Sequence, residues 1–214
     1  GAELADSGQV PAATVKGKLG ELYLTPCPTC RDAANVTMTV FSARYRCPHC
    51  RRIYALWDVA RTGRQTAREY ACPSCEHELR KSHEHLVDWK PALVKYACTR
   101  CGTGEKPPSR ADLKQVKQLD AAALPKGLWC PADPIPADSD EISRVLRSGI
   151  KTVADLFTGR NRLALASLWK EIGDVRDDAL RSRRAFAFTG TLPRASRTNK
   201  YIPSLHAAPG PLLG

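Results

Sequence analysis

The chain has 214 residues and nine cysteines, and its 33 basic and 22 acidic side chains give a net charge of +11. Its apolar content of 43% is ordinary for a globular protein and excludes disorder throughout. Because no N-terminal signal segment is evident and no apolar stretch approaches the roughly 20 residues of a transmembrane helix, we expect a cytoplasmic protein with no membrane partner.

The positive charge lies in two blocks of the sequence. Residues 27–118 carry seventeen basic and nine acidic side chains, a net of +8, and residues 179–214 carry six basic side chains and no acid. Residues 119–178, between the two blocks, hold eight basic and ten acidic side chains. This distribution favours an anionic partner such as DNA.

After a lead-in over residues 1–26, eight of the nine cysteines form four Cys-x-x-Cys pairs, which we call knuckles 1 to 4. They are Cys27/Cys30, Cys47/Cys50, Cys72/Cys75 and Cys98/Cys101. Each such turn lets two thiolates approach one cation at about 2.3 Å, and two turns complete a tetrahedral sulfur site. The sequence therefore predicts two structural zinc ions, held by two zinc ribbons over residues 27–118.

Three other uses of paired cysteines fit this sequence less well. Disulfides require an oxidising compartment, which nothing in the sequence indicates. Redox chemistry requires one pair at the start of a helix in a βαβ setting, whereas four pairs are present here. Catalytic zinc requires an open coordination position, which four thiolates do not leave.

Spacers of 16, 21 and 22 residues separate the knuckles, and each is long enough for a β-hairpin that returns one knuckle to the next. Residues 36–41 have strand composition, and residues 53–57 lead to a turn signal at Thr62-Gly63 and a return strand before Cys72. Pairing of neighbouring knuckles, 1 with 2 and 3 with 4, needs the least loop closure and is favoured, while a nested pairing stays open.

A tyrosine stands two residues before three of the knuckles and marks an internal repeat. We expect Tyr45, Tyr70 and Tyr96 to pack against the metal-binding turns.

The remaining metal-ligand side chains have simpler interpretations. With eight thiolates available, four histidines near the knuckles are expected to be solvated or hairpin residues rather than ligands; they are His49, His77, His83 and His85. Cys130 stands alone, and we expect a buried structural thiol.

Helical patterning follows a Pro/Ala-rich linker over residues 119–137. Asp138 and Glu141 form a plausible capping box for a helix that stops at Gly149. Thr158 precedes a strongly periodic helix that ends at Gly173, and a further helix is expected from about residue 174 or 175 to Phe188. The predicted fold class is therefore α+β, with tandem zinc-ribbon β-hairpins followed by a small helical block over residues 138–214.

The stretch from Thr189 to Tyr201 is basic, rich in hydroxyl groups and free of acids. Such a stretch suits phosphate contact, and the alternative is a solvated basic loop. The candidate DNA-binding residues are Arg194, Arg197 and Lys200 here, together with Arg183 and Arg184 in the preceding helix.

No motif in the chain indicates catalysis. It has no glycine-rich turn for S-adenosylmethionine, no Asn/Asp/Ser-Pro-Pro-aromatic tetrapeptide and no phosphate-binding P-loop. We therefore expect no catalysis by this chain alone.

The order of its motifs nevertheless resembles the central region of large, site-specific, adenine-type DNA methylases that contain zinc ribbons. The most telling piece is Phe157-Thr158-x-Arg160-Asn161, at the start of an Ala/Leu-rich helix, although many relatives have Pro or Lys where Gly159 stands. The other matching pieces are the knuckles, Trp129-x-Pro131, Ser148-Gly149-Ile150, Asp155–Leu165, Phe186–Thr189 and Arg194-Ala-Ser-Arg197.

In that family the cofactor loop precedes the ribbons and the catalytic motif follows the helical block. The resemblance thus implies a zinc-binding DNA-recognition segment of a restriction-modification methyltransferase, excised or naturally truncated, with S-adenosylmethionine bound only in a larger parent. Its partners would be DNA and the rest of the methyltransferase or a defence-system protein. The alternative is a stand-alone zinc-ribbon adaptor that binds another protein through the helix bearing Leu165 and Trp169.

Overall fold

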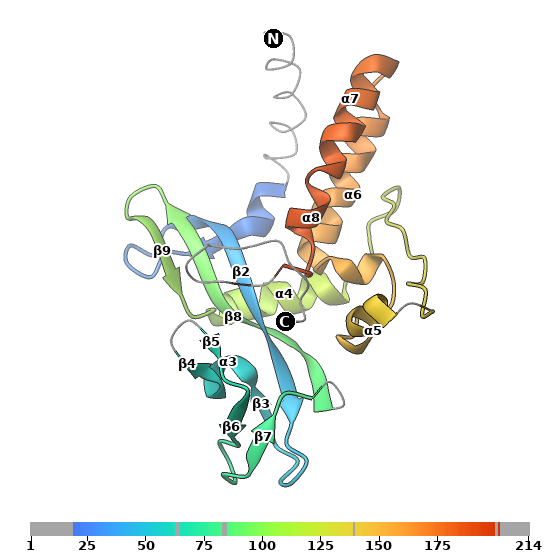
Figure 1. Ribbon diagram of the computed structural model, residues 1–214. Coiled ribbons are helices and arrows are strands. Elements are labelled where there is room, and N and C mark those ends of the chain that lie inside the picture. Colours follow the sequence, from blue (N-terminus) through green and yellow to red (C-terminus); the bar gives the residue numbers. More distant parts are fainter. Residues whose placement is uncertain (1–18, 63–64, 83–84, 139, 200, 202–214) are drawn as a thin grey trace.

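Two long antiparallel strands, β2 (Ala33–Arg46) and β8 (Leu86–Cys98), form the frame of the molecule (Figure 1). The structure is a computed structural model, and it describes residues 19–62, 65–82, 85–138, 140–199 and 201. The two strands pair along nearly their whole length, with three shifts of register. At about 3.3 Å per residue, a strand as long as β2 spans roughly 45 Å, so its two ends are far apart.

Short elements complete the sheet at each end of this long pair. The five-stranded sheet has the order β1-β2-β8-β9, with β3 pairing against β2, and two further two-stranded sheets are β4-β5 and β6-β7. The bounds are β1 Leu24–Pro26, β3 Ile53–Ala55, β4 Arg61–Thr62, β5 Gln65–Thr66, β6 Glu69–Ala71, β7 Glu78–Arg80 and β9 Gly102–Lys106. A 3₁₀ turn, η1 (Gly20–Tyr23), precedes β1, and a short helix, α3 (Leu56–Val59), follows β3.

The predicted α+β fold is confirmed, but two of the three predicted hairpins are wrong. The first spacer is the single strand β2, and the third contains the short strand β7 and the long strand β8, so β2 and β8 each carry the chain from one end of the sheet to the other. In the described part, only the middle spacer contains a hairpin of its own, formed by β4 and β5. Near-continuous strand-forming sequence, without a turn signal in residues 33–46, favours one long strand over a hairpin.

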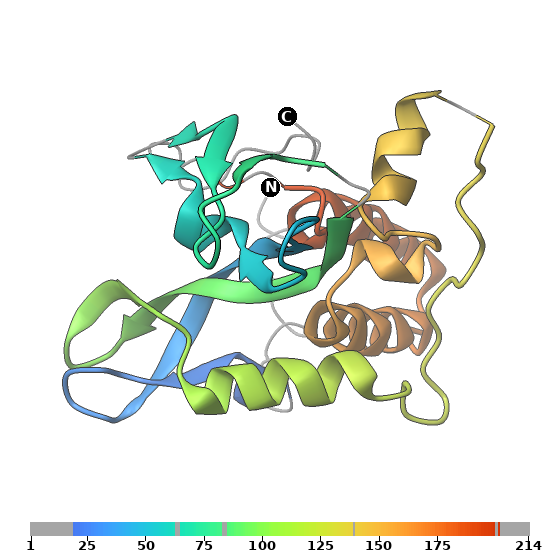
Figure 2. The ribbon, with the colours of Figure 1, turned by 90° about the horizontal axis from the view of Figure 1, so that it is seen from below.

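Helix α4 (Arg110–Ala121) lies along the sheet (Figure 2) and was not expected from the sequence. It crosses the boundary drawn at residue 118 between ribbon and linker. A capping box starts it, because the Ser109 hydroxyl accepts a hydrogen bond from the Asp112 amide and the Asp112 carboxylate accepts one from the Ser109 amide. The Ser-x-x-Asp spacing was visible in the sequence and could have predicted this helix.

Asp112 also fastens α4 to the sheet through a buried polar network. Its carboxylate accepts hydrogen bonds from the Thr25 hydroxyl at 2.6 Å and from the Lys106 ammonium at 3.0 Å. The Lys106 and Asp112 side chains are only 9% and 6% exposed. Burial alone would raise the pKa of Asp112, but the hydrogen bonds from Thr25 and Ser109 and the Lys106 charge outweigh it and hold that pKa below its usual value.

We predict that Asp112→Asn lowers the free energy of unfolding by about 3–5 kcal/mol at pH 7, because it leaves the buried Lys106 ammonium without its counter-charge. A depressed carboxyl pKa stabilises the folded state above the unfolded-state pKa of about 3.9, so the difference from wild type should shrink as pH falls through the folded-state pKa. Urea unfolding over a pH series in excess zinc measures both effects.

Asp58→Asn is the control, because Asp58 is exposed and its Lys90 partner lies 3.5 Å away. Equal losses in the two variants would contradict the role of burial.

The predicted helices of the second half are present, with adjusted bounds. Helix α5 (Asp140–Arg147) stops before Gly149, whose φ of 88° suits glycine. Helix α7 (Asp178–Thr189) starts a few residues later than expected because the Asp177 carboxylate caps the Leu180 amide. The capping box proposed for α5 involves the Glu141 side chain, which lies outside the described part.

Helix α6 (Gly159–Gly173) has the predicted bounds, and the Thr158 hydroxyl caps it by accepting from the Asn161 amide. Figure 1 shows α6 and α7 side by side as a helical hairpin that projects from the sheet. A short helix, α8 (Leu192–Ala195), follows α7, and a 3₁₀ turn, η3 (Ala154–Leu156), precedes α6. In the described part of the chain, no helix is both long and apolar enough to cross a membrane.

Gly159 is where the start of α6 meets the end of α4. A Cβ atom at Gly159 would lie 2.2 Å from the backbone oxygen of Leu119, which no side chain tolerates. The Gly159 amide donates to the Asp120 carboxylate at 2.6 Å, so the two helices are joined at this point. The close approach explains why this chain has glycine here.

Gly159→Ala should therefore destabilise the fold by about 1–3 kcal/mol, although alanine normally favours a helix, because the obstructing atoms belong to the backbone of α4. Gly173→Ala, at the other end of α6, meets no atom within 4 Å and should be neutral or mildly stabilising. Urea unfolding of the two variants in excess zinc provides the comparison. A Gly159→Ala protein as stable as wild type would rule out this helix contact.

Candidate metal centres

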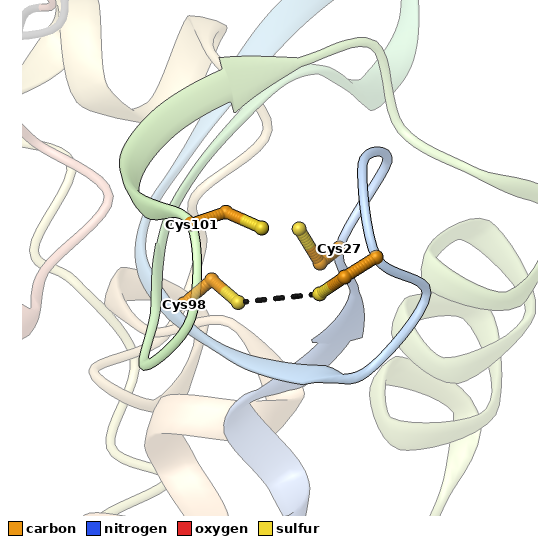
Figure 3. Close-up of side chains that lie close together, drawn as sticks. Cys27, Cys98 and Cys101 are labelled. Atoms are coloured by element: carbon orange, nitrogen blue, oxygen red, sulfur yellow. Dashed lines mark hydrogen bonds between the residues drawn. The ribbon is translucent and has the colours of Figure 1, made fainter.

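The eight knuckle cysteines gather into two groups of four. Site 1 consists of Cys27, Cys30, Cys98 and Cys101, and site 2 consists of Cys47, Cys50, Cys72 and Cys75. Within each group all four sulfur atoms lie within 4.8 Å of one another. Figure 3 shows site 1, where Cys27 from the turn before β2 faces Cys98 and Cys101 from the turn after β8.

The sulfur spacing fits a tetrahedral zinc ion. Sulfurs bound to zinc at about 2.3 Å lie about 3.8 Å apart along the edges of a tetrahedron. The Sγ–Sγ distance is 3.6 Å between Cys30 and Cys98, and 3.8 Å both between Cys47 and Cys75 and between Cys50 and Cys72. Each group therefore suits one metal ion, and the all-thiolate donor set favours zinc.

The four knuckles share one backbone conformation that directs the sulfurs inward. In each, the residue after the second cysteine has a positive φ, between 59° and 77°; these residues are Arg31, Arg51, Glu76 and Gly102. In knuckles 1 to 3 the amide of this residue donates to the carbonyl of the first cysteine, at 2.9 to 3.0 Å. Side chains with Cβ atoms occupy this left-handed conformation at a cost of roughly 1–3 kcal/mol, which indicates that the turn is imposed by the site.

The pKa values of Cys27 and Cys72 are lowered, whereas that of Cys30 is raised. The backbone amide of Cys30 is the largest influence that lowers the pKa of Cys27, to about 6, and the amide of Ser74 likewise lowers the pKa of Cys72 to about 7. For Cys30, the Asp32 amide lowers the pKa, but burial and the neighbouring thiols raise it to about 12. Four thiolates this close repel one another, so a divalent cation is the natural charge to hold them together.

The favoured pairing of neighbouring knuckles is wrong, and the nested pairing is correct. Knuckle 1 joins knuckle 4 in site 1, and knuckle 2 joins knuckle 3 in site 2. Each doubling of loop length adds only about 0.6 kcal/mol to the entropic cost of closing the loop. The free energy gained from pairing β2 with β8 easily outweighs this preference for short loops. Because β2 runs from knuckle 1 to knuckle 2, these knuckles lie at opposite ends of the sheet and cannot share an ion.

The predicted packing of the repeated tyrosines is confirmed. Tyr45 and Tyr70 lie in one buried cluster with Cys47 and Cys72 of site 2, and Tyr96 lies in another with Cys27 and Cys98 of site 1. All three tyrosines are at most 8% exposed. Each cysteine group is therefore part of a small hydrophobic core, so that a metal ion bound there would couple to folding.

Among the described residues, the histidines and the ninth cysteine lie outside the two groups of sulfurs. His49 and His77 are exposed and stack on each other beside site 2, with ring centroids 5.1 Å apart. His85 is half-buried, and His83 lies outside the described residues. Cys130 is half-buried, contrary to the prediction of a buried thiol, and burial raises its pKa.

The structure separates the five candidate DNA-binding residues. Arg183 and Arg194 are exposed, Arg184 is half-buried, and Lys200 lies outside the described residues. Arg197 is half-buried, its amide donates to the Leu156 carbonyl at 2.7 Å, and burial lowers the pKa of its guanidinium. Only two of the five are therefore presented to solvent in the described part.

Comparison with known proteins gives one partial similarity. The model of a family described as Rv1322 family protein matches residues 52–100, which is less than half of the chain, and that description states no activity. The matched segment contains both cysteines of knuckle 3 and the first cysteine of knuckle 4. No curated protein and no solved structure matches the chain.

The nested pairing predicts the metal content of double cysteine variants. Cys27→Ser with Cys98→Ser damages site 1 alone, so native mass spectrometry should find one zinc per chain. Cys27→Ser with Cys47→Ser damages both sites and should leave no tightly bound zinc. Pairing of neighbouring knuckles would reverse the two results, and that reversal would refute the arrangement.

Proposed function

We propose that this chain is the zinc-binding DNA-recognition segment of a site-specific adenine DNA methyltransferase that depends on S-adenosylmethionine. The two zinc centres would stiffen the sheet, and the helical block would present basic side chains to the duplex. The cofactor loop and the catalytic motif would lie in other parts of a larger parent. The ordered sequence blocks that resemble those methylases support this proposal.

The observation that carries the proposal is that these blocks pack into one junction. The Asn161 side-chain amide donates to the Ala195 carbonyl at 2.7 Å, which joins the Phe-Thr-x-Arg-Asn block to the Arg-Ala-Ser-Arg block. The Arg197 amide donates to the carbonyl of Leu156, the residue just before the first block, at 2.7 Å. Residues separated by more than thirty positions in the sequence are thus hydrogen-bonded to one another in the fold.

The arginine of the first block has a structural role in this junction. Arg160 is 7% exposed, stacks over the Tyr23 ring at 5.2 Å and donates to the Gln115 side chain at 2.8 Å. The Tyr23 hydroxyl in turn donates to Asn161 at 2.9 Å. The Arg160-Asn161 pair therefore connects η1, α4, α6 and α8, and it serves the scaffold that carries the basic segment.

Most polar groups of the basic segment are used within the protein. The Asn199 side-chain amide donates to three backbone carbonyls, and the hydroxyls of Thr189, Thr191 and Ser196 each donate to a carbonyl three residues earlier. These bonds order the segment and leave phosphate contact to its exposed Arg194 guanidinium, beside which Arg183 of α7 is also exposed. Arg183 and Arg194 are accordingly the phosphate contacts that we propose.

Protein docking is the second candidate function, because Trp169 on α6 is 39% exposed. An apolar side chain of this size on a helix surface suits a partner protein. Leu165, the other residue of the proposed adaptor surface, is half-buried. The DNA and adaptor proposals differ in their response to salt.

The deciding experiment measures DNA binding by the zinc-loaded chain at two salt concentrations, with labelled S-adenosylmethionine present. Binding that weakens steeply with salt, without methyl transfer, is the expected result. Absence of DNA binding at low salt would remove the proposal and favour the adaptor. Methyl transfer by the isolated chain would show that a catalytic site is present after all.

The exposed arginines can be tested by substitution. Arg183→Ala with Arg194→Ala should weaken binding about equally across sequences and reduce the slope of log K against log salt by about 2, since each phosphate contact contributes about 0.9. Lys126→Ala, an exposed cation in the segment after α4, is the control and should leave the slope nearly unchanged. An unaltered slope in the double variant would remove both residues from the interface.

A further inference from the structure

Phe186 on α7 is the most exposed large apolar side chain in the described part of the protein. It is 81% exposed, whereas Trp129 is 62% exposed and the other exposed large apolar side chains are 44% exposed or less. The neighbouring Phe188 behaves ordinarily, because its ring lies 5.2 Å from that of Trp169 and joins α7 to α6. Phe186 is therefore directed away from the helical hairpin and contributes little to its packing.

Two exposed arginines lie near Phe186. Arg183 and Phe186 are three residues apart on α7, so they are neighbours on the surface of one helix. Arg194 lies on α8, which begins after a two-residue turn at Gly190 and Thr191. We refer to Arg183, Phe186 and Arg194 together as the exposed stripe of α7 and α8.

The charge around this stripe selects an anionic partner. No acidic residue occurs from Ala179 to the end of the chain. Among the described residues, neither Arg183 nor Arg194 forms an ion pair with a carboxylate, whereas Arg181 is paired with Asp178. A protein surface that buried Phe186 would have to neutralise both guanidinium groups, while duplex DNA supplies phosphates on either side of an apolar base step.

We propose that Phe186 is a wedge that inserts between base pairs from the minor groove while Arg183 and Arg194 bind the flanking phosphates; this inference rests on the proposed DNA-binding function. Proteins that bind the minor groove frequently combine basic side chains with an inserted apolar side chain, which unstacks one step and bends the duplex. Insertion would bury a ring that is now 81% exposed. The Phe186 ring is accessible for insertion because no other part of α7 covers it.

The wedge and the phosphate contacts respond differently to salt. Phosphate contacts release counterions and set the slope of log K against log salt. Stacking of a ring on a base releases none, so it changes affinity by the same factor at every salt concentration. The two roles on the stripe can therefore be measured separately in the same protein.

The test compares wild type, Phe186→Ala and Leu113→Ala as zinc-loaded full chains. Leu113, on α4, is 42% exposed and serves as the control for loss of an exposed apolar side chain. The probe is an A·T-rich duplex with 2-aminopurine in place of some adenines, whose fluorescence rises when a base step is unstacked. Circular dichroism and zinc content should be equal in all three proteins because both substituted side chains are on the surface.

We expect Phe186→Ala to lower DNA affinity about tenfold at each salt concentration without changing the salt slope, and to abolish the rise in fluorescence. Leu113→Ala should behave as wild type. If Phe186→Ala retains wild-type affinity, or if wild type binds without raising fluorescence, the wedge is refuted while the proposed DNA binding stands. If wild type binds no DNA at low salt, the wedge and the proposed function are both refuted.

Discussion

The continuous pairing of β2 with β8 is the constraint on which the rest of the structure depends. These strands carry knuckle 1 and knuckle 2 to opposite ends of the sheet and return the chain to bring knuckle 4 beside knuckle 1. The ladder thereby decides which cysteines share an ion. It also positions the outer strands β1 and β9, to which α4 is fastened by the contacts of Asp112 with Thr25 and Lys106.

The two metal centres and the helical junction have complementary roles in this arrangement. Each metal centre closes one end of the sheet and packs with at least one buried tyrosine, so a small core is stabilised where few apolar residues are available. The junction of Arg160 and Asn161 then fixes the helical hairpin relative to η1 and α4. A rigid base of this kind lets an exposed stripe on α7 and α8 be presented in one orientation.

Local sequence signals predicted the elements and the ligands but not their long-range partners. The Cys-x-x-Cys spacing identified the eight cysteines that the fold gathers into two groups able to hold a metal ion, because the chemistry is local, and Thr158 with Gly173 located α6 for the same reason. The pairing of knuckles depends on strand length, which an argument from loop entropy does not contain. The burial of Arg197 depends on the carbonyl of Leu156, which only tertiary packing brings near. For α4, the Ser109–Asp112 cap was present in the sequence, but the residues up to 118 were assigned to the zinc ribbons and those after it to the linker.

The nested arrangement of the metal centres is most directly tested by cadmium NMR of the metal-exchanged chain. The two ¹¹³Cd signals should each lie in the range of four thiolate ligands, and scalar couplings should connect one signal to the β-protons of Cys27, Cys30, Cys98 and Cys101 and the other to those of Cys47, Cys50, Cys72 and Cys75. A single ¹¹³Cd signal coupled to Cys27 and Cys47 together would contradict the account, because it would require the two ends of β2 to meet at one ion.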